Sequence, residues 1–221
     1  MRRPPKVWTI VVGGGSGSRF GRPKQYEDLC GERVIDRSRL TAASVSDGVV
    51  VVVPAEDAAD EGGVPGGRNR SESVRAGLAR VPDDADVICV HDAARPLATA
   101  SLFRAVIAAV MAGADGAVPG IGVTDTIKVV DGDGVVVSTP DRSALVAVQT
   151  PQAFDAAVLR AAHADGADGT DDAGLVERRG GRIVVVTGEP QNRKITHADD
   201  LAWARSVIME PGWRKSEERG E

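Results

Sequence analysis

The amino-acid sequence predicts an α/β fold in which a mostly parallel, twisted β-sheet is covered by helices on both faces. Short runs of β-branched apolar residues recur along the chain, and stretches of helical character separate most of them. Runs that are apolar at nearly every position are typical of parallel strands buried on both faces. Their alternation with helices indicates strand–helix–strand units with right-handed connections. A length of 221 residues suits a single domain, which we expect to span residues 1–221.

The first predicted strand, residues 7–12, is an almost continuous β-branched run that ends in glycines. Residues 49–53 are all valine and are closed by Pro54. Shorter apolar runs predict further strands at residues 87–90, 117–118 and 183–186. The intervening segments predict helices at residues 33–43, 71–80, 100–112, 155–167, 171–179 and 197–209. Thr170 is the expected N-cap of the helix at 171–179.

One segment breaks the alternation of strands and helices. Residues 126–130 and 135–139 flank the turn sequence Asp-Gly-Asp-Gly, and nothing helical separates them. This pattern predicts a β-hairpin, because glycine supplies the positive φ that tight turns need. We expect the hairpin to project from the sheet as an arm, inserted at about residues 122–149. A two-stranded ribbon is marginally stable in water, so we expect the arm to pack against a partner subunit.

The composition excludes several other classes of protein. A net charge of −5 gives no reason to expect a nucleic-acid partner, which usually requires a concentrated basic face. Cys30 and Cys89 lie far apart without metal-ligand spacing, and we interpret both as reduced and structural. No apolar stretch approaches the ~20 residues that cross a bilayer, and the basic start is followed by a strand and glycines. We therefore expect a cytoplasmic protein with a disordered polar tail at about residues 212–221.

The first segment with recognisable chemistry is the glycine-rich loop after the first strand, where open parallel sheets place their ligand crevice. Its backbone N–H groups can approach phosphate oxygens closely, and two cations, Arg19 and Lys24, suit a polyphosphate. An ATP-binding P-loop is excluded, because the chain contains no Gly-Lys dipeptide. A dinucleotide fingerprint is also disfavoured, since Ser18 or Phe20 would stand where its third glycine belongs. The loop glycines and serine are Gly13, Gly14, Gly15, Ser16 and Gly17.

The second such segment is His91-Asp92-Ala93-Ala94-Arg95-Pro96, at the end of the third strand. Asp92 faces the same crevice and suits Mg²⁺, which prefers one or two carboxylates together with substrate oxygens. Arg95 could clamp a second phosphate. The residues alone leave open a structural alternative, in which Asp92 caps the next turn and Arg95 is solvated. His91 is interpreted as structural.

The order of the motifs along the chain resembles that of the 2-C-methyl-D-erythritol 4-phosphate cytidylyltransferase family. Besides the two segments above, the resemblance rests on residues 66–74 (GGRNRSESV), 123–128 (VTDTIK), 141–142, 149–152 (QTPQ), 170–173 and 192–196 (NRKIT). It covers nearly the whole chain, from about residue 7 to residue 208. It implies a Rossmann-like nucleotidyltransferase fold and the transfer of CMP from CTP to 2-C-methyl-D-erythritol 4-phosphate, with release of pyrophosphate.

The resemblance also implies a role for each matching residue. Arg19 and Lys24 match the pair that stabilises the transition state, and Asp92 matches the Mg²⁺ ligand. The residues that match the nucleotide-binding positions are Gly13 to Gly17, Gly67, Arg68 and Ser73. The residues that match the acceptor-binding positions are Arg95, Thr126, Arg142 and Lys194. In this family the arm lends Thr126 and Arg142 to the neighbouring subunit of a homodimer.

Two departures and three alternatives accompany this interpretation. The loop between Arg19 and Lys24 is short for the family, and Arg68 stands where relatives can carry an acidic residue, so only a backbone contact is expected there.

Ribitol 5-phosphate or a similar pentitol phosphate is the alternative acceptor. An inactive nucleotide-binding regulatory protein is the alternative of a different class, and a nicotinamide enzyme is a more distant one. Asp171 and Asp172 are interpreted as structural, because carboxylates favour the start of a helix.

Overall fold

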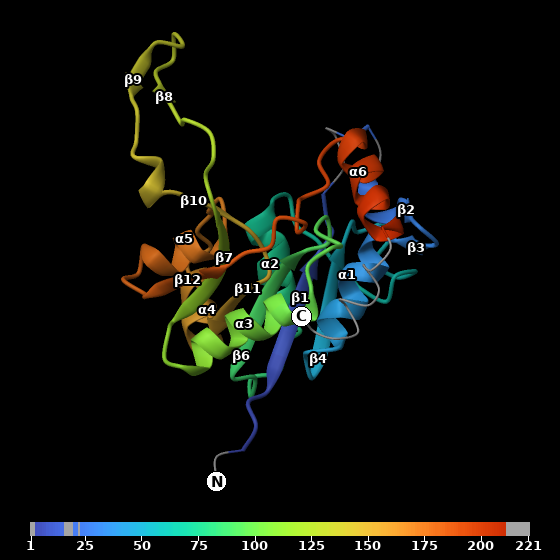
Figure 1. Ribbon diagram of the computed structural model, residues 1–221. Coiled ribbons are helices and arrows are strands. Elements are labelled where there is room, and N and C mark those ends of the chain that lie inside the picture. The colour runs from blue at the N-terminus through green and yellow to red at the C-terminus, as the bar shows by residue number, and fades with distance from the viewer. Residues whose placement is uncertain (1–2, 16–19, 22, 211–221) are drawn as a thin grey trace.

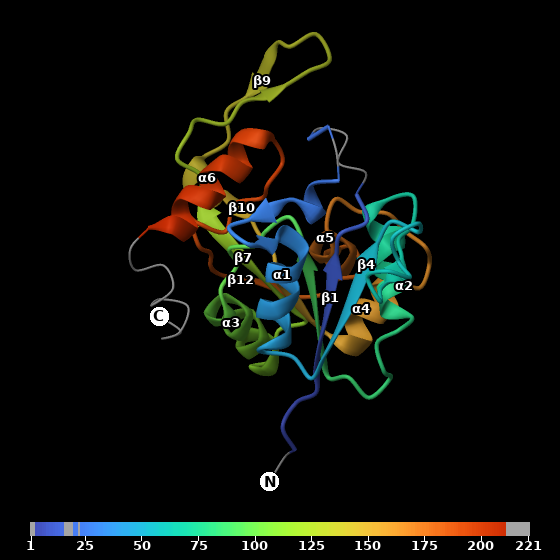
Figure 2. The same ribbon diagram turned by 90° about the vertical axis from the view of Figure 1, so that its right-hand side faces the viewer.

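A mixed eight-stranded sheet forms the centre of the chain, with helices on both of its faces (Figures 1 and 2). The computed structural model describes residues 3–15, 20–21 and 23–210, so the tail expected at 212–221 lies outside the described residues. The strands of this sheet are β1 (Val7–Val12), β4 (Gly48–Val53), β5 (Val64–Pro65), β6 (Val87–Asp92), β7 (Gly116–Gly122), β10 (Val146–Val148), β11 (Gln152–Asp155) and β12 (Ile183–Thr187). Their order is β10-β7-β11-β6-β1-β4-β5, with β12 paired to β7.

The pairing of these strands confirms the predicted mostly parallel sheet. β1 is an interior strand that pairs in parallel with β4 and β6, while β4 pairs in parallel with β5 and β7 with β12. β10 and β11 are antiparallel to their neighbours. β11 was not predicted, because Gln-Ala-Phe-Asp carries no β-branched run. β6 also continues beyond the predicted 87–90, so that His91 and Asp92 belong to the strand itself.

The helices divide between the two faces of the sheet. α1 (Val34–Ala43) and α3 (Ala100–Met111) pack on one face, where Val7, Val11, Val51 and Val53 point. α2 (Arg70–Leu78), α4 (Ala156–His163) and α5 (Asp172–Glu177) pack on the other, against Ile10, Val50, Val52 and Val90. Alternate residues of one valine run thus enter different cores, as the period of two in a strand requires. Valine runs buried on both sides explain why so few aromatic residues suffice.

The caps of the shorter helices are set by carboxylates and an amide. Asn69 caps α2 by accepting a hydrogen bond from the Glu72 N–H. Asp171 caps α5, because its side chain accepts from the Gly174 N–H at 2.9 Å. The prediction of Thr170 as this N-cap was therefore wrong by one residue: carboxylate and hydroxyl are both good caps, and the local sequence does not rank them.

The remaining elements lie at the edges of the sheet. α6 (Ala198–Met209) packs against the small hairpin β2 (Asp28–Leu29) and β3 (Glu32–Arg33) in a separate apolar cluster. Two short 3₁₀ helices are η1 (Lys24–Tyr26) and η2 (Arg142–Ala144). Among the residues that the structure describes, none of the helices has the length and apolar character to span a bilayer.

The predicted arm is present as a projecting hairpin. β8 (Val129–Val130) and β9 (Val136–Ser138) pair antiparallel, and the hairpin extends well beyond the sheet in both views (Figures 1 and 2). The Asp131 carboxylate accepts from the Asp133 and Val135 N–H groups, and Gly134 has a φ of 79°. The aspartate and glycine residues from which the turn was predicted therefore form it.

Candidate active site

The loop after β1 and the end of β6 lie side by side at the carboxyl edge of the sheet. Val12 is the register partner of Asp92, so the glycines that follow Val12 begin beside that carboxylate. The Gly13 N–H donates to the Val52 carbonyl at 2.7 Å, and the Ala93 N–H donates to the Val12 carbonyl at 2.9 Å. These bonds join the first and second segments of interest, which are about 80 residues apart in the sequence, at one edge of the sheet, where open α/β sheets bind ligands.

Asp92 stands at the centre of a cluster of charged side chains. Its Oδ2 lies 2.6 Å from the Lys194 ammonium, and its Oδ1 lies 3.2 Å from Nε of Arg70. Burial by itself would raise the pKa of Asp92, but Arg70, Lys194 and Arg95 together bring that pKa well below its usual range. Asp92 is therefore a charged carboxylate at neutral pH. The structural alternative for Asp92 is not what the structure shows, since the side chain bonds to cations rather than capping a turn.

Arg70 continues the cluster toward the other face of the sheet. Its Nη1 lies 2.7 Å from Oδ2 of Asp172, whose Oδ1 lies 3.0 Å from Nε2 of His163. Asp172 is fully buried, and His163 and Arg70 hold its pKa below the ordinary value although burial would raise it. Sequence reasoning gave Arg70 no role. Its presence in a quoted motif was a signal, but its partners lie 22 and 102 residues away and only the fold identifies them.

The segment between β5 and α2 approaches the glycine loop closely. A Cβ on Gly14 would lie 3.3 Å from the Ser73 hydroxyl oxygen, and one on Gly66 would lie 3.1 Å from it. Ser73 donates its hydroxyl hydrogen to the Asn69 carbonyl at 2.9 Å and accepts from the Gly67 N–H at 3.1 Å. The structure thus brings together Gly14, Gly67 and Ser73 of the expected nucleotide-binding set. A Cβ at Gly14 or Gly66 would crowd the Ser73 hydroxyl, which must then shift by a few tenths of an ångström.

Arg68 does not point into this crevice. Its side chain is 91% exposed and pairs with Glu72 at 2.5 Å, and its backbone N–H also donates to Glu72. The Arg68 backbone N–H is therefore hydrogen-bonded within the protein itself. Gly15 is exposed beyond the end of β1. Ser16, Gly17 and Arg19 lie outside the described residues, whereas Lys24 is half-buried in η1.

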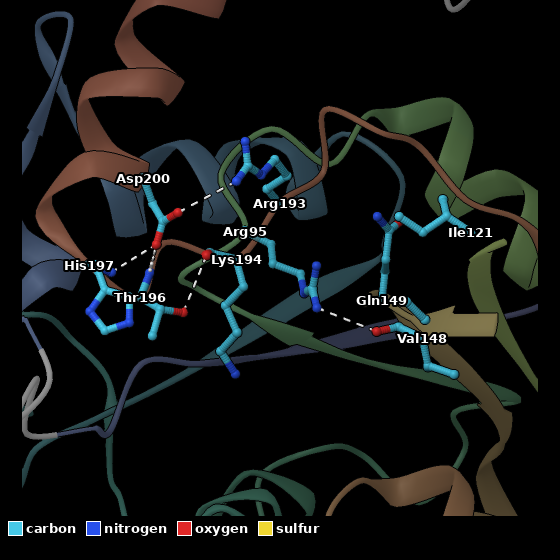
Figure 3. A pocket seen from close by; sticks show the side chains of 10 residues that line it. Arg95, Ile121, Val148, Gln149, Arg193, Lys194, Thr196, His197 and Asp200 are labelled. Atoms are coloured by element: carbon cyan, nitrogen blue, oxygen red, sulfur yellow. Dashed lines mark hydrogen bonds and ion pairs between the residues drawn. The ribbon is translucent and has the colours of Figure 1, made fainter. Parts of the chain in front are cut away.

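A cavity of about 430 Å³ lies beside this cluster, between the base of the arm and the segment that leads into α6 (Figure 3). Arg95 and Lys194 line it, and sequence reasoning gave no role to three other ionisable residues of its wall: Arg193, His197 and Asp200. Nη1 of Arg95 donates to the Asn192 carbonyl at 2.7 Å. Three cations against one carboxylate make this wall suited to an anion.

Buried amides hold the wall of this cavity in place. Gln149 donates from Nε2 to the Glu189 carbonyl at 2.8 Å, and Asn192 donates from Nδ2 to the Thr150 carbonyl at 2.8 Å. Both side chains are buried. They belong to motifs noted in the sequence, where their residue types gave no indication that they hold backbone rather than ligand.

Thr126 and Arg142 lie on the arm and are not brought to Asp92 by their own chain. Both are exposed, and Nη1 of Arg142 donates to the Thr124 carbonyl at 2.6 Å, within the arm. The hairpin that lies between them in the sequence projects from the sheet (Figure 1). The hydrogen bond of Arg142 is thus made within the arm and not to the site residues expected on the sheet.

His91 has the structural surroundings expected of it. It is fully buried, its ring packs on Phe103 at 5.1 Å between centroids, and Nδ1 contacts the Thr150 hydroxyl at 3.1 Å. Burial lowers the pKa of His91 to about 4, so the ring is neutral at physiological pH. A neutral histidine enclosed in the core is unsuited to exchange protons with a substrate.

The donor set around Asp92 fits one kind of metal ion. The described residues contain no cluster of three or more histidine, cysteine or carboxylate side chains that could enclose a metal. A single anionic carboxylate at the edge of a ligand crevice is instead what Mg²⁺ uses when substrate phosphates and waters complete its coordination. Asp92 therefore fits a metal ion that arrives with a phosphate ligand.

Comparison with known proteins agrees with this arrangement. The sequence model of the IspD family, 2-C-methyl-D-erythritol 4-phosphate cytidylyltransferase, matches residues 7–210. Curated members of the family from Rhodococcus jostii and Nocardia farcinica are 46% and 43% identical to this chain. The alignments cover 92% and 91% of this chain, and 96% and 94% of the relatives.

Solved structures show the same likeness in three dimensions. The crystal structure of 4-diphosphocytidyl-2C-methyl-D-erythritol synthase from Anaerococcus prevotii superposes with a TM-score of 0.82 at 27% identity, covering 93% of this chain and 99% of that one. The Thermus thermophilus cytidylyltransferase superposes with a TM-score of 0.80 at 29% identity, covering 93% of this chain and 100% of that one. The sheet topology, the arm and the motif order thus agree with the sequence matches, and the chain belongs to the 2-C-methyl-D-erythritol 4-phosphate cytidylyltransferase family.

Proposed function

We propose that this chain transfers CMP from CTP to 2-C-methyl-D-erythritol 4-phosphate, forming 4-(cytidine 5'-diphospho)-2-C-methyl-D-erythritol and pyrophosphate in the non-mevalonate isoprenoid pathway. Family membership supports the reaction. The observation that carries the proposal is the cluster at the carboxyl edge of the sheet, where Asp92 and Lys194 meet beside the glycine loop.

The chemistry requires two anions to approach each other. An oxygen of the acceptor's phosphate monoester attacks the α-phosphorus of CTP, and the bond from that phosphorus to the bridging oxygen of pyrophosphate breaks. The attacking oxygen is already ionised, so no general base is needed, which agrees with the enclosed, neutral His91. Catalysis then consists of positioning and of stabilising negative charge.

The residues divide this work between the two substrates. We assign Arg19 and Lys24 to the triphosphate in the transition state, with Gly13 to Gly17 around the phosphates. Gly67 and Ser73 are assigned to cytosine, and Arg68 only through its backbone. Arg95 and Lys194 are assigned to the acceptor, together with Thr126 and Arg142 from the arm. The proximity of Gly14, Gly67 and Ser73 supports the nucleotide side, and the cationic cavity wall supports the acceptor side.

Asp92 is the residue that would hold Mg²⁺. A bound Mg²⁺ would supply positive charge to the phosphates of CTP. The Lys194 ammonium contacts Oδ2 of Asp92 at 2.6 Å, so a cation already lies beside this carboxylate. Mg²⁺ held by Asp92 would add to the positive charge that Lys194 supplies there.

A homodimer completes the site in this proposal. Thr126 and Arg142 are exposed on an arm that projects from their own sheet, and the strands of that arm expose valines. A second copy of the chain would cover those valines and receive the two polar residues. The single-domain organisation and the cytoplasmic location expected from the sequence also stay predictions.

An acceptor assay tests the function. Purified protein is mixed with CTP and Mg²⁺ and with either 2-C-methyl-D-erythritol 4-phosphate or ribitol 5-phosphate, and pyrophosphate release is followed. Turnover with the first acceptor is expected, and turnover with ribitol phosphate alone would overturn the proposal. Lys24→Ala is the matched variant, with an expected loss of about 10²–10³ in kcat. If wild type and Lys24→Ala are equally inert while both bind CTP, the inactive regulatory alternative is supported instead.

A further inference from the structure

Arg70 is held between two carboxylates at the start of α2. Its guanidinium donates from Nε to Oδ1 of Asp92 at 3.2 Å and from Nη1 to Oδ2 of Asp172 at 2.7 Å. The Arg70 side chain is 23% exposed, whereas those of Asp92 and Asp172 are 8% and 1% exposed. Nη2 of Arg70 is buried without a hydrogen-bond partner among the described residues. The hydrogen bonds of this guanidinium are therefore made to two buried carboxylates.

The side of Arg70 remote from Asp92 is rigidly anchored. Asp172, the first residue of α5, also contacts Nε2 of His163, the last residue of α4, at 3.0 Å, and both side chains are almost completely buried. If the guanidinium moved away, the charge of Asp172 would be left buried with a weaker set of partners, which is strongly unfavourable. The direction in which Arg70 points toward Asp92 is thus set by α4 and α5, on the face of the sheet opposite α1 and α3.

The two carboxylate oxygens of Asp92 have different cationic partners. Arg70 occupies Oδ1, and Lys194, whose side chain is 39% exposed, contacts Oδ2. A cation that arrives from solvent can displace the lysine more readily than the anchored arginine. Asp92 is therefore prepared to offer one oxygen to a metal ion. Mg²⁺ takes carboxylates in this one-oxygen manner, whereas Ca²⁺ also accepts both oxygens of a carboxylate.

We propose that Arg70 is a positioning residue for the metal-binding step: by holding Oδ1, it presents Oδ2 of Asp92 as a one-oxygen ligand for Mg²⁺ bound to CTP. The inference rests on the proposed function, in which Asp92 is the metal ligand. Asp172 and His163 act through Arg70 by fixing its guanidinium. Hydrogen-bonded groups behind a metal ligand commonly alter metal affinity or activity by about 10- to 100-fold when removed.

Arg75 offers a matched control on the same helix. It lies in α2, its side chain is 24% exposed, and it pairs with Asp168 at 3.3 Å and with the Ala167 carbonyl at 2.8 Å. The exposed fraction of its side chain is therefore close to that of Arg70, but its carboxylate partner is 61% exposed and its partners do not include Asp92. Arg75→Met thus removes an ion-paired arginine from the same helix without removing a partner of Asp92.

The experiment measures how much a metal ion strengthens CTP binding in the absence of acceptor. The dissociation constant of CTP is determined with EDTA, with Mg²⁺ and with Ca²⁺ for wild type, Arg70→Met, Arg70→Lys and Arg75→Met. For each variant we compare the dissociation constant of CTP in EDTA with that in the presence of metal. The ratio of the two constants removes any effect of the substitution on metal-free CTP binding. For Arg70→Met we expect the Mg²⁺ ratio to fall about tenfold and the Ca²⁺ ratio to fall less. Arg70→Lys should lie between, because one ammonium cannot bridge both carboxylates.

The outcomes separate this inference from the proposed function. If folded Arg70→Met keeps the Mg²⁺ ratio of Arg75→Met, the inference is wrong, even while wild type turns over CTP and acceptor. If wild type shows neither turnover nor a gain in affinity with Mg²⁺, the proposed function fails first. Should Arg70→Met not fold, the double variant Arg70→Met with Asp172→Asn carries the same test, because it removes the buried charge together with its partner.

Discussion

At the scale of the residue, the site depends on side chains that are distant in sequence but adjacent in space. Lys194 lies 102 residues from Asp92 and contacts its carboxylate at 2.6 Å, while Arg70 approaches the same carboxylate from α2. Because Arg70 remains, Asp92 keeps a cationic partner when Lys194 is removed. Lys194 is therefore a residue whose loss should affect the reaction more than the fold.

Lys194→Met is expected to reduce kcat by about 10²–10³, because a cation that stabilises charge in the transition state is lost. The melting temperature should shift by no more than the 2–4 °C that about 1 kcal/mol produces in a chain of this size. Steady-state pyrophosphate release and thermal melting measure the two effects. Lys6→Met is the control, since Lys6 pairs with Asp84 at the opposite end of β1. Equal kinetics of the two variants would contradict the role assigned to Lys194.

His91 makes the stability of the protein depend on acid pH. Its pKa is about 4 in the fold and 6.5 ordinarily, so the unfolded chain binds the proton first as pH falls. Stability is therefore unaffected by this residue above about pH 6.5 and decreases from there down to pH 4. At 1.36 kcal/mol per unit the loss is about 3 kcal/mol.

Denaturant unfolding of the metal-free, nucleotide-free protein between pH 7 and pH 4 measures this loss. His91→Asn, which keeps a hydrogen-bonding group near Thr150 but does not titrate, should show a smaller decrease over the same interval. The same slope in both proteins would mean that His91 is not the group responsible.

At the scale of the element, the contacts within the arm account for only part of its stability. Its turn is held by Asp131, but its strands expose large apolar side chains, including Val135 at 62% and Val137 at 65%. A ribbon of two strands has little stability of its own in water. The exposed valines therefore agree with a partner surface that covers them, which is the homodimer proposed above.

Val137→Glu is expected to weaken the homodimer at least tenfold, about 1.4 kcal/mol, because a charge would be buried at the interface. Acceptor turnover should decrease in parallel, since Thr126 and Arg142 would no longer reach the other subunit. Sedimentation equilibrium over a range of concentrations measures the association. Leu40→Glu on α1, at a leucine that is 58% exposed, is the control and should leave the association unchanged.

Elements also show where local sequence signals are insufficient. Gly77 lies inside α2, where helix propensity favours alanine by about 1 kcal/mol. A Cβ at this position would lie 2.5 Å from Cγ2 of Ile10, so close packing of α2 on β1 requires the glycine. β11 is likewise a strand because two neighbouring strands, β6 and β7, leave a position for it, and not because of its own residues.

At the scale of the whole molecule, the fold and the metal ion are separable. Asp92 is compensated by Arg70 and Lys194, so this buried anion does not depend on a metal for its partner. EDTA should therefore abolish turnover, and added Mg²⁺ should restore it, while the melting temperature changes by less than the ~2–4 °C that 1 kcal/mol produces. Thermal melting and pyrophosphate release on the same sample test this. Unfolding caused by EDTA would show that a metal holds the fold together.

The sequence by itself determined the mostly parallel sheet, the arm with its turn and the order of the motifs. These are local properties: valine runs, helical spacing and the residues of tight turns act within a few positions of one another. Asp92 was also proposed from a local motif, because it ends a predicted strand beside the glycine loop, whereas Lys194 was proposed only from the resemblance to the family.

Only the tertiary structure decided how those motifs act together. It assigned Arg70 to Asp92 and Asp172 and placed Arg193 in the wall of the cavity. It also showed that the hairpin between Thr126 and Arg142 projects from the sheet and that Arg142 bonds within the arm. The physical reason is that charge pairing acts over a few ångströms of space, whatever the distance along the sequence. Partners that are 22 or 102 residues apart are therefore identified only when the fold brings their strands and helices together.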